Sequence, residues 1–159
     1  MARPKANKPT PSANPPLHAS DRARRRRVAA ESRARSAHVV ICASDASGPP
    51  ALRGAIESLG FDVDAFSTFA DALRGLARTS PDVVVIELAD CDPECIRMLQ
   101  LLRRSAPQTP LVIVSQDGSL GARAACQPLR PFYYAVPPIS KDELRSALNS
   151  ALEHRTARA

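Results

Sequence analysis

The sequence has no run of about 18 apolar residues, the length that a helix needs to span a bilayer. Its N-terminus also lacks the apolar core of a secretory signal, so we expect a cytoplasmic protein. The few cysteines stand at irregular positions and form no disulfide framework, which favours reduced thiols: Cys42, Cys91, Cys95 and Cys126. The histidines are scattered without visible partners, which argues against an enzyme built on a histidine base: His18, His38 and His154.

Positive charge is concentrated at one end of the chain. Residues 1–37 hold ten Lys and Arg and two acidic residues, a balance of +8, whereas residues 38–159 sum to −2. Five prolines among the first sixteen residues oppose regular helix, so we predict a disordered Pro-rich and Arg-rich arm over residues 1–37. Its candidate polyanion-binding residues are consecutive: Arg24, Arg25, Arg26 and Arg27.

The arginine run has three interpretations. It is a solvated charge block, a contact for nucleic-acid phosphates or acidic lipid, or part of a mitochondrial presequence, which the prolines argue against. A basic arm without aromatic residues binds nucleic acid without sequence preference.

From residue 38 onward, short apolar runs alternate five times with helical patterns. The β-branched content predicts strands at residues 38–42, 62–66, 82–88, 111–115 and 132–136. Helices are predicted at residues 49–59, 68–78, 93–104, 119–126 and 140–153. Five βα units predict an α/β fold, a doubly wound five-stranded parallel sheet of flavodoxin-like (βα)5 type with strand order 2-1-3-4-5. This domain is expected over residues 38–154, followed by a short tail at 155–159.

A functional crevice in such a sheet lies at the carboxyl ends of strands 1 and 3. These ends carry Ala43, Ser44, Asp45 and Glu87. The first strand leads into Ala-Ser-Asp-Ala-Ser-Gly and offers no Gly-x-Gly-x-x-Gly, so a dinucleotide site of Rossmann type is the weaker interpretation.

Five motifs resemble the receiver domains of bacterial two-component response regulators, the CheY-like domains. They are Leu-Gly-Phe-Asp-Val (59–63), Ala-Asp-Ala-Leu (70–73), Pro-Asp-Val-Val-Val-Ile-Glu-Leu (81–88), Thr-Pro-Leu-Val-Ile-Val-Ser (109–115) and Tyr-Ala-Val-Pro-Pro-Ile (134–139). The resemblance covers residues 38–153, and the order and spacing of the motifs are fairly specific for the fold.

The resemblance implies a phosphorylation site whose acidic groups are changed. In receivers an acidic pair after strand 1 and an aspartate ending strand 3 hold a magnesium ion. The pair falls on Ala43 and Ser44, and the phosphoacceptor position falls on Glu87. Asp45 supplies a carboxylate only if the loop shifts register. We therefore expect no tight magnesium site, no other metal and no cofactor.

Three further positions follow from the resemblance. The hydroxyl that engages the phosphoryl group is matched by Ser115, the strand-5 lysine is replaced by Pro137, and the switch aromatic is matched by Tyr134. Pro138 matches the proline after that lysine, so a cis bond is expected at Val136–Pro137 or Pro137–Pro138. Phosphorylation by the standard route is not expected, because each missing group stabilises phosphoryl transfer.

We interpret the chain as a pseudo-receiver, a non-catalytic signalling module of a two-component or phosphorelay pathway that acts by protein–protein interaction. The partner is a histidine kinase, another regulator or a second copy of the chain. One alternative is a response regulator phosphorylated on Glu87 or Asp45. Another is a nucleic-acid-associated protein that acts through its arm.

Several side chains keep two interpretations. Glu87 is either a permanent mimic of phospho-aspartate or, more simply, a solvated carboxylate. Cys91 and Cys95 form either a redox or metal pair or small-residue packing. Tyr134 is either a switch or an amphipathic rim residue. The acidic loop that contains Cys91 is either a cation site or solvated: Asp90, Asp92 and Glu94.

Overall fold

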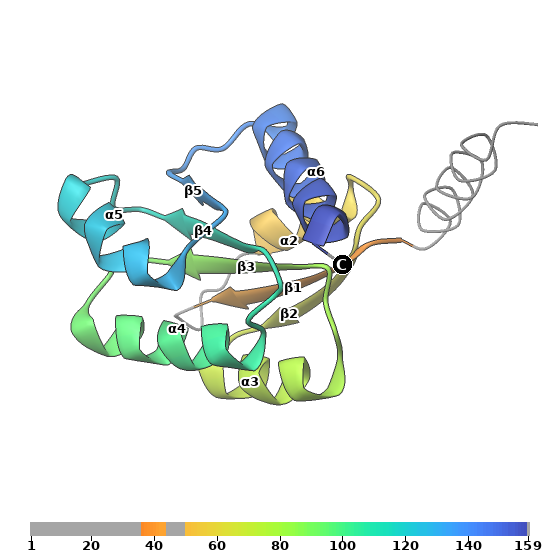
Figure 1. Ribbon diagram of the computed structural model, residues 1–159. Coiled ribbons are helices and arrows are strands. Elements are labelled where there is room, and N and C mark those ends of the chain that lie inside the picture. Colours follow the sequence, from red (N-terminus) through yellow and green to blue (C-terminus); the bar gives the residue numbers. More distant parts are fainter. Residues whose placement is uncertain (1–35, 44–49, 159) are drawn as a thin grey trace, which may run out of the picture. The chain divides into compact units, whose positions relative to one another are not determined.

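The central sheet has five parallel strands in the order β2-β1-β3-β4-β5 (Figure 1). The computed structural model describes residues 36–43 and 50–158, so the predicted arm through residue 35, with its arginine run, and residues 44–49 lie outside the described residues. The predicted α/β fold and strand order are confirmed. The strands are β1 (His38–Ala43), β2 (Asp62–Phe66), β3 (Val83–Leu88), β4 (Leu111–Ser115) and β5 (Tyr133–Ala135).

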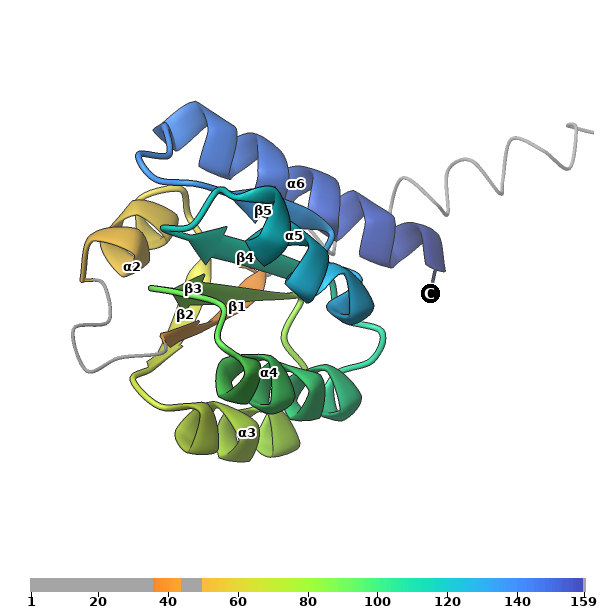
Figure 2. The same ribbon diagram turned by 90° about the vertical axis from the view of Figure 1, so that its left-hand side faces the viewer.

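Helices cover both faces of the sheet (Figure 2). One face is covered by α2 (Pro50–Glu57) and α6 (Lys141–Arg158). The other is covered by α3 (Phe69–Arg78), α4 (Pro93–Ser105), α5 (Leu120–Cys126) and the 3-10 turn η1 (Gln127–Leu129). Among the helices of residues 50–158, none has the length and apolar character needed to cross a membrane.

The strands are apolar along their length because the helices bury both faces of the sheet. Side chains alternate between the faces of a strand, so those of β3 divide between two cores. Val84, Ile86 and Leu88 pack with α3, α4 and α5, whereas Val83 and Val85 pack with α2 and α6. All five are at most 3% exposed, and each contributes about 1.5–3 kcal/mol by leaving water. This burial fixes the position of Glu87 within β3.

Side-chain caps begin four of the helices. Each cap accepts a hydrogen bond from the backbone N–H three residues further on, at 2.8–3.1 Å: Thr68 for α3, Asp92 for α4, Ser119 for α5 and Ser140 for α6. The predicted end of the first helix at residue 59 is two residues too late, since α2 ends at Glu57, and Gly60 beyond it has a φ of 90°, a left-handed conformation that glycine adopts readily.

The last helix is longer than predicted. α6 continues to Arg158, so the tail expected at residues 155–159 is helical through Arg158, and the expected end at residue 153 is wrong. No proline or glycine interrupts residues 153–158. Arg155 also fixes this last part of the helix, because its Nη1 donates to the Pro81 carbonyl and, at 2.7 Å, to Asp82 Oδ1.

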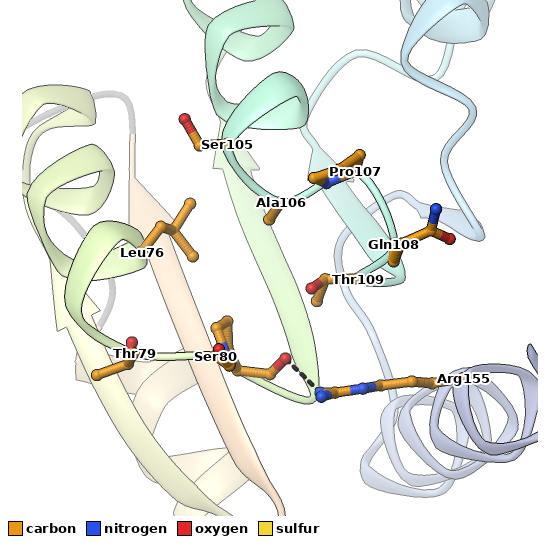
Figure 3. A pocket seen from close by; sticks show the side chains of 10 residues that line it. Leu76, Thr79, Ser80, Ser105, Ala106, Pro107, Gln108, Thr109 and Arg155 are labelled. Atoms are coloured by element: carbon orange, nitrogen blue, oxygen red, sulfur yellow. Dashed lines mark hydrogen bonds between the residues drawn. The ribbon is translucent and has the colours of Figure 1, made fainter. Parts of the chain in front are cut away.

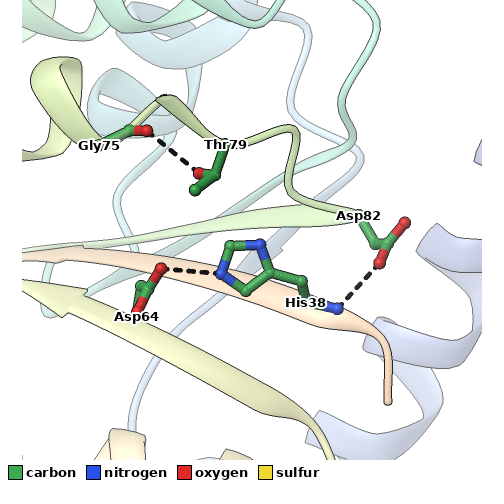
Figure 4. A network of polar contacts seen from close by, with 5 residues as sticks. All are labelled: His38, Asp64, Gly75, Thr79 and Asp82. Atoms are coloured by element: carbon green, nitrogen blue, oxygen red, sulfur yellow. Dashed lines mark hydrogen bonds and ion pairs between the residues drawn. The ribbon is translucent and has the colours of Figure 1, made fainter. Parts of the chain in front are cut away.

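Polar contacts hold the first strand at the amino edge of the sheet (Figure 4). The His38 backbone N–H donates to Asp82 Oδ2 at 2.8 Å, and the His38 ring Nε2 lies 3.0 Å from Asp64 Oδ2. Thr79 Oγ1 donates to the Gly75 carbonyl at 3.1 Å, which ends α3 just before β3. His38 therefore joins the start of β1 to the middle of β2 and to the residue just before β3.

Candidate functional site

The carboxyl edge of the sheet places one acidic side chain at its centre. The strand register aligns Ala43 of β1 with Glu87 of β3, Glu87 with Val114 of β4, and Val114 with Ala135 of β5. Glu87 is half-buried, and the three residues in line with it are buried and apolar. Within this aligned row Glu87 is the only carboxylate. Ser44 and Asp45 lie outside the described residues.

Ser115 ends β4 one position beyond this row, beside Leu88. Its side chain is fully buried, and its Oγ accepts a hydrogen bond from the Asp117 backbone N–H at 3.2 Å. The residue predicted to match the phosphoryl-contacting hydroxyl therefore lies at the same edge of the sheet as Glu87. In this arrangement it also orders the start of the loop between β4 and α5.

Pro137 follows β5 at the position predicted to match the receiver lysine. The Pro137–Pro138 peptide is cis, as the sequence predicted for one of two bonds. A proline carries neither an ammonium group nor a backbone N–H. Position 137 therefore supplies no cation and no donor to an anion at this edge.

Tyr134 lies on the face of the sheet that α5 covers and joins β5 to the loop between β4 and α5. Its hydroxyl donates to the Asp117 carbonyl at 2.6 Å, and the Arg123 guanidinium carbon lies 4.7 Å from the ring centroid. Burial is the main cause that raises the pKa of Tyr134. In contrast, the Ser119 backbone N–H, 2.8 Å away, lowers the pKa of Asp117. The aromatic ring is thus held inward by a hydrogen bond and a cation–π contact.

The four cysteines belong to the core between the sheet and α3, α4 and α5. Cys91 Sγ lies 3.5 Å from Cys126 Sγ. The sequence had suggested Cys95 as the possible partner of Cys91, because the two are close in sequence. Burial raises the pKa of Cys42 and of Cys126 to about 12 and that of Cys95 to about 11. No sequence signal pointed to this contact, because it joins residues that are brought together only by the fold.

The acidic loop before α4 is engaged in helix capping. Asp92 Oδ1 accepts from the Cys95 backbone N–H at 2.8 Å, and Pro93 occupies the first turn, where its missing N–H costs no hydrogen bond. Within residues 36–43 and 50–158, no three His, Cys, Asp or Glu side chains are grouped to hold a metal ion.

A hollow of about 440 Å³ opens at the opposite, amino edge of the sheet (Figure 3). Its polar boundary is Arg155, whose guanidinium is already engaged by the Pro81 carbonyl and Asp82. The lining comes from the ends of α3 and α4 and the starts of β3 and β4: Leu76, Thr79, Ser80, Pro81, Ser105, Ala106, Pro107, Gln108 and Thr109. Its lining offers hydroxyl groups but no carboxylate, histidine or cysteine to activate one, so the carboxyl edge remains the better candidate.

Sequence comparison relates the chain to regulatory proteins. No protein-family model matches it. It is 24% identical over 104 residues to the luminescence regulatory protein LuxO of Vibrio campbellii, and 26% identical over 117 residues to the transcriptional regulatory protein GlrR of Escherichia coli K12. The matches cover 65% and 74% of this chain but 23% and 26% of those proteins. The chain thus spans about a quarter of the length of these curated relatives.

Solved structures share the fold. The CheY-like response regulator receiver domain of Methanospirillum hungatei JF-1 superposes with a TM-score of 0.69 at 14% identity, covering 79% of this chain and all of that chain. The signal receiver domain of an HD domain-containing protein of Pseudomonas fluorescens Pf-5 gives 0.67 at 21% identity, covering 78% and 92%. The chain therefore has the fold of CheY-like response regulator receiver domains, and the predicted resemblance is confirmed.

Proposed function

We propose that this chain is a receiver-like module of two-component signalling that works by binding another protein, without phosphorylation at the receiver aspartate position. One observation supports the proposal most: near the carboxyl end of β3 the strand register pairs Glu87 with Ala43 of β1, so the neighbouring strand offers no second carboxylate there. The usual lysine position holds Pro137. The module needs no cofactor and acts in the cytoplasm.

The chemistry of phosphoryl transfer supports this proposal. Magnesium is bound through one or two carboxylates and must offset the charge of the incoming phosphate, but Ala43 offers only a methyl group. The additional methylene of Glu87 moves its carboxylate about an ångström from the place of an aspartate carboxylate, and in-line attack tolerates such displacement poorly. Pro137 cannot pair with phosphoryl oxygens.

The face formed by α5, β5 and α6 supports a protein partner. Leu120 at the start of α5 is 86% exposed, and Arg123 and the half-buried Tyr134 lie on the same part of the fold. Tyrosine and arginine are enriched in protein interfaces. We expect this face, or that of α2, to bind a histidine kinase, another regulator or a second copy of the chain.

Incubation with acetyl phosphate and Mg²⁺, followed by intact-mass measurement, tests the proposal. We expect no phosphorylated species for the natural chain. The matched control is the variant Ala43→Asp, Ser44→Asp, Glu87→Asp, Pro137→Lys, which restores the acidic pair, the aspartate and the lysine and should gain a phosphoryl group. Phosphorylation of the natural chain that disappears in Glu87→Gln would instead support the alternative of an unconventional acceptor.

A further inference from the structure

Two sulfur atoms from distant parts of the sequence meet beside the carboxyl edge of the sheet. Cys91 lies in the segment between β3 and α4, Cys126 ends α5, and 35 positions separate them. Their Sγ atoms are 3.5 Å apart, so forming a disulfide of about 2.05 Å needs an approach of about 1.5 Å. Cys91 belongs to neither a helix nor a strand, which allows a movement of this size without breaking a hydrogen-bonded element.

We propose that Cys91 and Cys126 form an intramolecular disulfide when the protein meets an oxidising low-molecular-weight disulfide such as oxidised glutathione. The Cys91 thiolate attacks one sulfur of the small disulfide, forms a mixed disulfide and releases one small thiolate, which takes up a proton. The Cys126 thiol then loses its proton and attacks Cys91 Sγ, which releases the second small thiol. Two protein thiols and one small disulfide thus give one protein disulfide and two small thiols.

The structure distinguishes the roles of the two cysteines. Cys91 is half-buried, so a small reagent can reach it, whereas Cys126 is fully buried. Burial also raises the pKa of Cys126 to about 12, which leaves it a thiol near neutral pH and a poor first nucleophile. Once Cys91 carries the mixed disulfide, the sulfur of Cys126 is already next to the sulfur that it attacks. This proximity increases the rate of the second, intramolecular step.

The remaining cysteines are less suitable partners. Cys95 is held in the first turn of α4, where its backbone N–H donates to Asp92. Among the described residues, the sulfur contact recorded for Cys91 is the one to Cys126, at 3.5 Å. Cys42 is fully buried within β1. Both therefore serve as internal controls.

The bond would connect the segment after Glu87 to α5. Both sulfurs also lie close enough to Tyr134 to influence its pKa. Oxidation would then restrain the loop after β3 against the helix that carries Leu120 and Arg123. The inference does not depend on the proposed function, since the cysteines pair whether or not Glu87 accepts a phosphoryl group.

The test uses the full chain, treated with oxidised glutathione under native conditions, then alkylated and analysed by mass spectrometry. We expect the free thiols to fall from four to two, with no glutathione retained and a crosslink between the tryptic peptides 79–97 and 124–141. Because peptide 79–97 also contains Cys95, the variant Cys95→Ser is needed, and it should still form the crosslink. Cys91→Ser should keep its three thiols, whereas Cys126→Ser should accumulate glutathione on Cys91.

Circular dichroism of each variant before oxidation establishes that it is folded. Four surviving thiols in the natural chain would overturn the proposal. So would a crosslink that persists in Cys91→Ser, one that is lost in folded Cys95→Ser, or one that forms only in denaturant.

Discussion

Asp82 connects three parts of the chain at the amino edge of the sheet. Its Oδ2 accepts from the His38 backbone N–H at 2.8 Å, and its Oδ1 accepts from Arg155 Nη1 at 2.7 Å. The Arg155 and Asp82 side chains are 32% and 36% exposed, so solvent screens their charges. The hydrogen bonds to Asp82 and Pro81 are therefore the larger part of what Arg155 contributes.

The substitution Arg155→Ala should lower the free energy of unfolding by about 1–2 kcal/mol, because it leaves the Pro81 carbonyl and the Asp82 carboxylate short of a donor. Urea denaturation under reducing conditions measures the loss. Arg145→Ala is the matched control on the same helix. Its partner Asp142 is 90% exposed, so we expect a change below about 0.5 kcal/mol. Equal losses for the two variants would show that the Arg155 contacts do not stabilise the fold.

Among the helices and strands, the sequence predicted those features that a local residue pattern determines, such as the type and order of the elements. β3 is a run of valine and isoleucine that only a sheet covered on both faces accommodates, so its type and central place followed from composition. The helix starts at residues 93 and 119 were predicted to within one residue from the local helical pattern. The end of α6 did not, because Arg155 is fixed by contacts with Pro81 and Asp82, far away in sequence.

The candidate site was predicted in the same uneven way. Glu87 and Ser115 could be placed because they lie at the carboxyl ends of regular strands, as the penultimate residue of β3 and the last of β4, and Pro137 because it follows β5. The contact between Cys91 and Cys126 could not be placed, since nothing in the local spacing of either cysteine refers to the other. A contact that depends on how helices and strands pack can be predicted only once the fold is known.

The start of α4 provides a test at this scale. Asp92→Ala should lower the free energy of unfolding by about 1 kcal/mol, because the Cys95 backbone N–H loses its acceptor. Asp90→Ala, which removes an exposed carboxylate from the same loop, should change it by less than about 0.5 kcal/mol. Chemical denaturation of both variants measures the difference. If Asp90→Ala lowered the free energy of unfolding as much as Asp92→Ala, the loss would come from the negative charge of the loop and not from the helix cap.

At the scale of the whole molecule, charge and core are separated along the chain. Residues 1–35 carry a net charge of +8, whereas the described core residues all belong to residues 39–151. Ser36 stays with the folded unit, since its Oγ donates to the Gly60 carbonyl at 2.8 Å. Residue 36 is therefore the appropriate start for a truncated chain.

Removal of residues 1–35 should leave the melting temperature nearly unchanged and abolish most of any affinity for nucleic acid that the full chain shows, because the arginine run is lost. Binding of the full chain should fall steeply with salt and show little sequence preference. Titration of both chains with two unrelated duplexes at two salt concentrations checks this. If the truncated chain kept its affinity, or if the full chain preferred one duplex by more than about a hundredfold, the folded unit itself would bind nucleic acid.

We propose that the carboxyl edge around Glu87 does not assemble a phosphorylation site. The most direct measurement is a titration of the protein with Mg²⁺ and beryllofluoride, a mimic of the phosphoryl group, followed by amide NMR shifts. We predict no saturable shifts at residues beside Glu87, Ser115 or Tyr134, and saturable shifts in the variant Ala43→Asp, Ser44→Asp, Glu87→Asp, Pro137→Lys. Saturable shifts in the natural chain that vanish in Glu87→Gln would contradict the account.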